Sequence, residues 1–177
     1  MLFKTICAGF GGQGVLSMGL NLAQAAFLEG KNVTFLPAYG AEIRGGTANC
    51  TVAISDEEIA SPVASSPEFL VAMNRPSLVR FQNRVQSGGI FFINASVMEA
   101  EVSRGDVDIV GVQANHIAEE LGNPRVANMV MLGAFAAKTN LVSLSALVEA
   151  MKETLTGKKR LVPVNEQALR RGFGLEV

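Results

Sequence analysis

A glycine-rich segment near the start of the chain has the residue types and spacing of a phosphate-binding turn. Gly9, Gly11 and Gly14 match the pattern G-x-G-x-x-G, with Gly12 and Gln13 between them. The segment follows an apolar run and precedes an amphipathic stretch, which is the strand-to-helix context that this motif requires. Glycines let the backbone turn tightly and approach a ligand, and the free N–H groups of a following helix attract anions. The sequence therefore predicts an anion-binding turn.

A dinucleotide site would require one more residue, which the chain lacks. In dinucleotide-binding folds an acidic residue about 20 positions further on binds the ribose. Here the chain reads Leu36, Pro37, Ala38 and Tyr39 at and just after the end of the expected second strand, so the pattern argues against NAD. An alternative interpretation is that the glycines serve only a tight turn and close helix packing.

A second segment contains three groups that could contact a ligand. The phenol of Tyr39, the carboxylate of Glu42 and the guanidinium of Arg44 lie within six residues, and Gly45 and Gly46 follow. We expect this loop at the carboxyl end of the second strand, where open α/β sheets bind ligands. An arginine there could bind a phosphate or a carboxylate with two parallel hydrogen bonds. The alternative is a local Glu–Arg pair on a solvated loop.

The remaining reactive residue types are few. His116 is the only histidine, and Cys7 and Cys50 are the only cysteines, which excludes a four-thiolate cluster or a cysteine-rich zinc site on this chain alone. We expect His116 near a helix start or on the surface and both cysteines in the core. Asn128 interrupts an apolar helix, and because a buried amide needs partners, we expect it to anchor a loop or to contact a ligand.

Strands and helices alternate along the chain, beginning with a strand–helix–strand unit. Strands are expected at 3–8, 32–36, 47–54, 69–73, 90–93 and 107–112, with an irregular loop at 37–46. Helices are expected at 15–29, 76–85, 114–121, 124–138 and 143–154, and a last one begins at Asn165. This order predicts an α/β fold: a three-layer α/β/α single domain over residues 1–177, with a mostly parallel or mixed sheet and a Rossmann-like beginning.

Composition narrows the class of protein further. Of the 177 residues, 49% are hydrophobic and 18% charged, with a net charge of −1. The charge balance argues against a nucleic-acid binder, and the apolar runs are too short for a membrane span. No signal-peptide pattern is visible at the N-terminus, so we expect a cytoplasmic protein. Low charge and high apolar content predict a surface that a partner covers.

The two glycine segments together resemble the gamma subunit of 2-oxoacid:ferredoxin oxidoreductases. The resemblance is carried by residues 9–14 and 39–46 and continues through 57–62 and 127–129. In that family the second loop usually reads Tyr-Gly-Pro-Glu. Ala41 replaces the proline here, which loosens the turn but leaves the polar groups in place.

The resemblance implies a non-autonomous subunit of an enzyme that oxidatively decarboxylates a 2-oxoacid and forms an acyl-CoA. It implies alpha, beta and delta partner subunits that carry thiamine diphosphate, Mg and iron–sulfur clusters and pass electrons to ferredoxin, with no cofactor bound by this chain alone. It further implies that residues 9–14 receive the phosphates of CoA or face the thiamine site, with Glu42 and Arg44 positioning a ligand or a partner. Among the possible substrates we expect 2-oxoglutarate.

Two other functions fit the same residues. One is a stand-alone module that binds a nucleotide or CoA. The other is a purely structural interface subunit, in which the glycines serve close packing. An apolar-rich chain without its partners could also form a homodimer through the surface meant for them.

Overall fold

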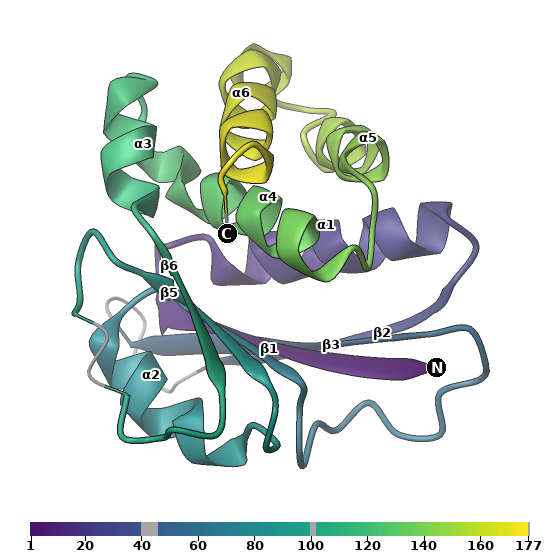
Figure 1. The fold of residues 1–177 in the computed structure, drawn as a ribbon. Helices are drawn as coiled ribbons and strands as arrows, with labels where there is room; N and C mark the ends of the chain where they lie inside the picture. The colour runs from purple at the N-terminus through teal and green to yellow at the C-terminus, as the bar shows by residue number, and fades with distance from the viewer. Residues whose placement is uncertain (40–45, 100–101, 177) are drawn as a thin grey trace.

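The computed structural model describes residues 1–39, 46–99 and 102–176 (Figure 1). Their strands form one six-stranded sheet in the order β2-β3-β1-β4-β5-β6. The strands β1, β4, β5 and β6 are parallel, whereas β3 runs antiparallel to both β1 and β2. The strands are β1 (Leu2–Phe10), β2 (Asn32–Tyr39), β3 (Thr47–Ser55), β4 (Phe69–Ala72), β5 (Ile90–Asn94) and β6 (Asp108–Val112).

Helices cover both faces of this sheet, which confirms the predicted α/β/α layers. On one face lies α2, and on the other lie α1 and α4, with α5 and α6 packed outside them (Figure 1). Within the described part of the chain, no helix is long and apolar enough to cross a membrane. The helices are α1 (Val15–Leu28), α2 (Arg75–Phe81), α3 (Ala114–Glu120), α4 (Ala127–Thr139), α5 (Leu144–Thr154) and α6 (Val162–Phe173), with 3-10 turns η1 (Gln82–Arg84), η2 (Pro124–Val126) and η3 (Lys159–Leu161).

The initial strand–helix–strand unit is confirmed, with one addition. Strand β2 is parallel to β1, but β3 lies between them and pairs with both. Strand β2 also extends to Tyr39, three residues beyond the predicted end. Pro37 is tolerated there because β2 is an edge strand, where a missing N–H group need not break a ladder hydrogen bond.

Each face of the sheet has its own apolar core. In the larger core, under α1 and α4, the rings of Phe69 and Phe92 lie 5.5 and 5.1 Å from that of Phe135. In the smaller core, under α2, Phe91 packs with Phe81. Neighbouring residues of β5 thus serve opposite cores, as the alternation of side chains along a strand requires.

Helices α4 and α6 cross at two glycines. A Cβ on Gly133 would overlap the carbonyl oxygen of Leu169, and a Cβ on Gly172 would overlap that of Val130. The two helix backbones therefore touch, and α4 is buried from Ala127 to Ala136. Apolar residues on every side of this helix predicted that it would be buried on several sides, and the structure confirms this.

The helix starts show which cap signals were informative. Ser143 caps α5 as predicted, since its Oγ accepts from the N–H of Ala146 at 3.1 Å. Helix α6 begins at Val162, earlier than the predicted start at Asn165, and Pro163 occupies its first turn. The Asn165 amide donates to the carbonyl oxygen of Leu161 at 2.8 Å. That side chain therefore bonds backward within the helix instead of capping it.

Candidate functional site

The glycine turn, residues 9–14, joins β1 to α1, and packing requires two of its glycines. A Cβ on Gly9 would lie 2.8 Å from both Gln13 Oε1 and Val15 Cγ1. A Cβ on Gly14 would lie 2.5 Å from Asn128 Nδ2, which donates to the Gly14 carbonyl oxygen at 3.1 Å. Close packing therefore explains both glycines, and the expected anchoring role of Asn128 is confirmed.

Gly12 differs from these two glycines. It has a φ of 96°, and a Cβ placed on it would meet no atom within 4 Å. Two residues further on, Gly14 takes up a left-handed conformation with φ 70°, and α1 begins without a side-chain cap among the described residues. The first amides of α1 point out of the helix, where they can bind an anion.

The crevice between the carboxyl ends of β1 and β4 is the topological switch point of the sheet. The connection after β1 rises to α1 on one face, and that after β4 descends to α2 on the other (Figure 1). Dinucleotides bind in such crevices, but here the Gln13 side chain fills it. Its Oε1 accepts from Phe10 N at 2.7 Å and Asn74 Nδ2 at 2.8 Å, and its Nε2 donates to the Met73 carbonyl oxygen at 3.2 Å. This geometry agrees with the argument against NAD.

A row of carboxamides continues from Gln13 along the same edge of the sheet. Asn94, at the end of β5, is fully buried and donates to Asn115 Oδ1 at 2.7 Å. Ser96 Oγ accepts from the N–H groups of Asn115 and His116 at 3.1 and 3.2 Å. The sequence interpretation missed Asn74, Asn94 and Asn115. For Asn74 and Asn94, the position directly after a predicted strand was the signal that could have identified them, whereas Asn115 lies within the predicted helix 114–121.

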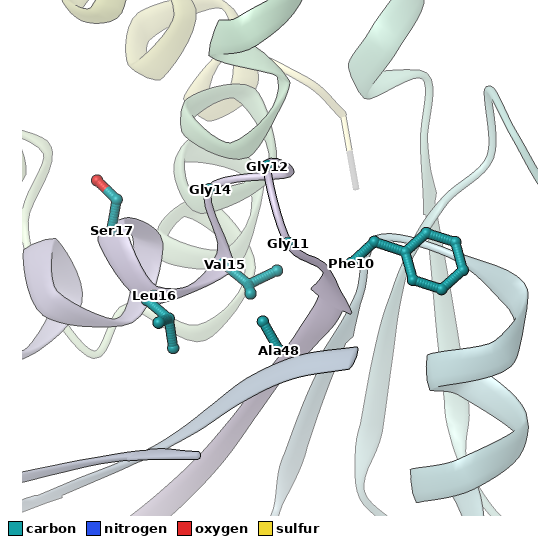
Figure 2. A pocket seen from close by; sticks show the side chains of 8 residues that line it. All are labelled: Phe10, Gly11, Gly12, Gly14, Val15, Leu16, Ser17 and Ala48. Carbon is teal, nitrogen blue, oxygen red and sulfur yellow. The ribbon is translucent and has the colours of Figure 1, made fainter. Parts of the chain in front are cut away.

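A cavity of about 310 Å³ lies on the side of the glycine turn that faces β3 (Figure 2). The side chains of Val15 and Ala48 approach each other across it, whereas the Phe10 ring points away (Figure 2). Its other lining residues are Gly11, Gly12, Gly14, Leu16 and Ser17. These residues are uncharged, so backbone N–H groups and the start of α1 supply the polarity.

An arginine of α2 reaches the end of β1 from the face of the sheet opposite α1. Arg80 of α2 donates to Thr47 Oγ1 at 3.1 Å, and Thr47 precedes Ala48 in β3. The Arg80 guanidinium also lies 5.2 Å from the centre of the Phe81 ring. Arg80 therefore places a positive charge at the end of β1, beside the Phe10–Thr47 pair of the sheet.

The structure brings the two predicted loops together. The N–H of Gly11 donates to the carbonyl oxygen of Gly46 at 2.9 Å. In the sheet, Ala48 pairs with Gly9 on one side and with Tyr39 on the other, so both motifs reach the same edge. The predicted site residues Glu42, Arg44 and Gly45 lie outside the described residues.

The remaining candidates for chemistry have structural explanations. Cys7 and Cys50 are buried partners across β1 and β3. A hydrogen bond with the Cys50 thiol and burial together raise the pKa of Cys7. His116 lies on α3 with two thirds of its side chain exposed, 3.3 Å from Glu120. In the described part of the chain no group of three His, Cys, Asp or Glu residues could hold a metal ion.

Comparison with known proteins identifies the family. The family model described as "Pyruvate ferredoxin/flavodoxin oxidoreductase" matches residues 4–175. The ketoisovalerate oxidoreductase subunit VorA of Methanothermobacter thermautotrophicus is 47% identical over 167 residues, which are 93% of this chain and 34% of VorA. The chain therefore spans about a third of the length of this curated relative.

Two solved structures share the fold. The gamma subunit of a keto/oxoacid ferredoxin oxidoreductase from Geobacter sulfurreducens PCA matches 97% of this chain and 96% of its own, with a TM-score of 0.83 and 26% identity. The 2-oxoglutarate:ferredoxin oxidoreductase from Magnetococcus marinus, solved with 2-oxoglutarate, coenzyme A and succinyl-CoA, matches 97% of this chain and 30% of its own, with a TM-score of 0.89 and 26% identity. The resemblance to gamma subunits is thus confirmed, and the chain belongs to the pyruvate ferredoxin/flavodoxin oxidoreductase family.

Proposed function

We propose that this chain is the gamma subunit of a 2-oxoacid:ferredoxin oxidoreductase that oxidatively decarboxylates a 2-oxoacid to an acyl-CoA. Its partners are alpha, beta and delta subunits, and the complex passes electrons to ferredoxin in the cytoplasm. One of the solved relatives contains 2-oxoglutarate and coenzyme A, and the VorA relative is named for ketoisovalerate. We retain 2-oxoglutarate as the expected substrate, with ketoisovalerate and pyruvate as the acids to compare with it.

The observation that carries this proposal is the contact between the two glycine segments. The bond from Gly11 to Gly46 holds the last residue of the second segment against the glycine turn. Beside it lies the cavity of about 310 Å³ at the start of α1. A helix start with free N–H groups favours a phosphate, so we assign to this edge the phosphates of CoA or the approach to the thiamine site. Tyr39, Glu42, Arg44 and Gly45 complete the proposed contact surface.

The donor set of this chain suits an anionic substrate better than a redox centre. The open backbone of Gly12 leaves room for a ligand, because no atom lies where its Cβ would be. Both cysteines are buried inside the sheet, and iron–sulfur clusters require several thiolates. Thiamine diphosphate, Mg and the clusters are therefore assigned to the partner subunits. This chain contributes binding and orientation.

A purely structural subunit is the second candidate, because packing explains Gly9 and Gly14 and internal hydrogen bonds occupy Gln13. In that case the glycine turn supports assembly and touches no ligand. A replacement in the second loop separates the two functions. We expect Arg44→Ala to lower CoA-dependent turnover about a hundredfold with assembly intact, whereas the matched replacement Arg160→Ala, on the exposed η3 turn, leaves turnover unchanged. Unchanged turnover in Arg44→Ala would favour the structural role.

The experiment that tests the assignment is anaerobic purification of the tagged chain from its native host. We expect larger chains, iron and thiamine diphosphate in the eluate, and reduction of a viologen dye that requires both CoA and one 2-oxoacid. Comparing 2-oxoglutarate, ketoisovalerate and pyruvate identifies the substrate. Elution of the chain alone and free of iron would contradict the proposal and favour a stand-alone nucleotide- or CoA-binding module.

A further inference from the structure

A second, smaller cavity lies on the other side of the glycine turn, toward β4 and α3. Its volume is about 150 Å³, several times the 30 Å³ or so that a water molecule occupies in the liquid. It shares Gly12 with the first cavity. Its other lining residues are Gln13, Met73, Asn115, Pro124, Arg125 and Ala127.

Hydrogen bonds within the protein already use the acceptors around this cavity. Gln13 Oε1 accepts from Phe10 N and from Asn74 Nδ2. The Met73 carbonyl oxygen accepts from Gln13 Nε2 at 3.2 Å and from Asn94 Nδ2 at 3.5 Å. Asn115 Oδ1 also accepts a hydrogen bond, from Asn94 Nδ2. A ligand therefore finds few free acceptors on this wall.

Two side-chain donors around the cavity are free. In the described part of the chain, neither Asn115 Nδ2 nor the Arg125 guanidinium has a hydrogen bond or an ion pair. The arginines Arg104, Arg170 and Arg171, by contrast, each form an ion pair with a carboxylate. No acidic side chain lines the cavity. A wall whose side-chain oxygens already accept hydrogen bonds, and which carries a free amide and a free guanidinium, is suited to an oxyanion.

The backbone fixes both donors. Pro124 begins the 3-10 turn η2, and the side chain of Asn123 accepts from the N–H of Arg125 at 3.1 Å. Asn115 lies in the first turn of α3, where its N–H donates to Ser96 Oγ and its Oδ1 is held by the buried Asn94. The backbone at both residues is therefore held in place before a ligand binds.

Arg125 also borders a third cavity, of about 360 Å³. This cavity extends away from the sheet toward α5 and α6, and its walls combine apolar side chains with neutral amides. Among its lining residues are Ser17, Asn123, Leu155, Leu161 and Asn165. It has the size and polarity to hold the uncharged part of a small molecule whose charged group contacts Arg125.

We infer that Arg125 and Asn115 form a binding site for the phosphate group of a small phosphorylated molecule, with its uncharged part in the cavity between η2, α5 and α6. This site uses the face of the glycine turn that the proposed function leaves unoccupied. It concerns this chain by itself, so its test is independent of partner subunits and turnover.

The test is titration of the isotope-labelled full chain with inorganic pyrophosphate, followed by NMR. We expect shifts of the Gly12 backbone amide and of the Asn115 side-chain amide. Arg125→Gln should weaken binding about tenfold, as the loss of a charge-assisted hydrogen bond implies. Arg125→Lys keeps the charge but not the planar guanidinium, so its affinity for pyrophosphate should lie between those of the parent chain and Arg125→Gln. Arg160→Gln, which removes an equal charge on η3, should bind like the parent chain.

Three outcomes would overturn the inference. One is equal affinity of Arg125→Gln and the parent chain for pyrophosphate. Another is a set of NMR chemical-shift changes confined to the amides of Val15, Leu16 and Ser17, which would place the anion in the cavity of Figure 2. The third is equal binding of acetate at the same ionic strength, which would show a general carboxylate site. Thermal unfolding of Arg125→Gln serves as the folding control and should match the parent chain, because the side chain has no partner to lose.

Discussion

The glycine turn and the crossing of α4 and α6 both depend on glycine, but for different reasons. At the helix crossing, Gly133 and Gly172 allow two backbones to touch, and any side chain would overlap a carbonyl oxygen. At the glycine turn the reasons are mixed. Gly9 and Gly14 face protein atoms, whereas Gly12 faces none. Packing therefore accounts for Gly9 and Gly14, whereas the φ of 96° is what requires a glycine at position 12.

The largest effect is expected at the helix crossing. Gly172→Ala places a methyl group against the carbonyl oxygen of Val130, and a helix backbone cannot move aside as a flexible side chain can. We expect a loss of about 3 kcal/mol in the free energy of unfolding, measured by chemical denaturation. Gly157→Ala is the control, because its Cβ would meet nothing within 4 Å. Similar midpoints for the two variants would show that the crossing is looser than its geometry indicates.

A smaller loss is expected at the packed part of the turn. Gly14→Ala combines a φ of 70° with a Cβ only 2.5 Å from Asn128 Nδ2, so we expect a cost of about 2 kcal/mol. In an Asn128→Ala background the clash disappears. Gly14→Ala should then lower the free energy of unfolding by about 1 kcal/mol, because only the cost of the left-handed backbone remains. Strictly additive effects in this double-mutant cycle would contradict the direct contact.

Gly12 provides the opposite case. Gly12→Ala keeps an unfavourable φ of 96° but meets no neighbour, so we expect a loss of only about 1 kcal/mol. A change in Asn128 should not alter this cost, since the two residues do not touch. A cost as large as that of Gly14→Ala would mean that Gly12 is packed and would remove the distinction between the two parts of the turn.

Acid pH gives the smallest effect and serves as a reference outside both regions. Two hydrogen bonds from Arg104, at 2.8 and 2.6 Å, lower the pKa of Asp106 to about 2. Because the folded pKa lies below the unfolded value of about 3.9, this carboxylate contributes stability above that value and loses it as the pH falls toward 2. The parent chain and the glycine variants should lose the same increment in acid denaturation, and Asp106→Asn should lack it. A variant-dependent increment would reveal coupling between distant sites.

Most elements follow from the sequence because apolar periodicity and caps are local signals. The helix starts at Val15 and after Ser143 illustrate this, since each depends on residues within a few positions. The end of β2 was predicted too early, because the effect of Pro37 depends on whether its strand is at an edge. The start of α6 was misplaced for a related reason. Asn165 resembles a cap but bonds backward to Leu161.

The candidate site was predicted in part. The sequence placed residues 9–14 and the second loop at one edge of the sheet, and the bond from Gly11 to Gly46 agrees. It did not distinguish the roles of the individual glycines, because these depend on the folded positions of other side chains, such as Asn128 beside Gly14. The bond between Asn94 and Asn115 likewise joins two separate elements, β5 and α3.

The sequence by itself determined the alternation of strands and helices, the glycine turn between the first strand and the first helix, and the resemblance to a family. These depend on local periodicity and on short motifs. Only the tertiary structure showed that β3 lies between β1 and β2, that Gln13 fills the switch-point crevice, and that Arg125 borders two cavities. Strand order and the hydrogen bonds of Gln13 to Met73 and Asn74 join residues far apart in the chain, so their physical cause exists only once the chain has folded.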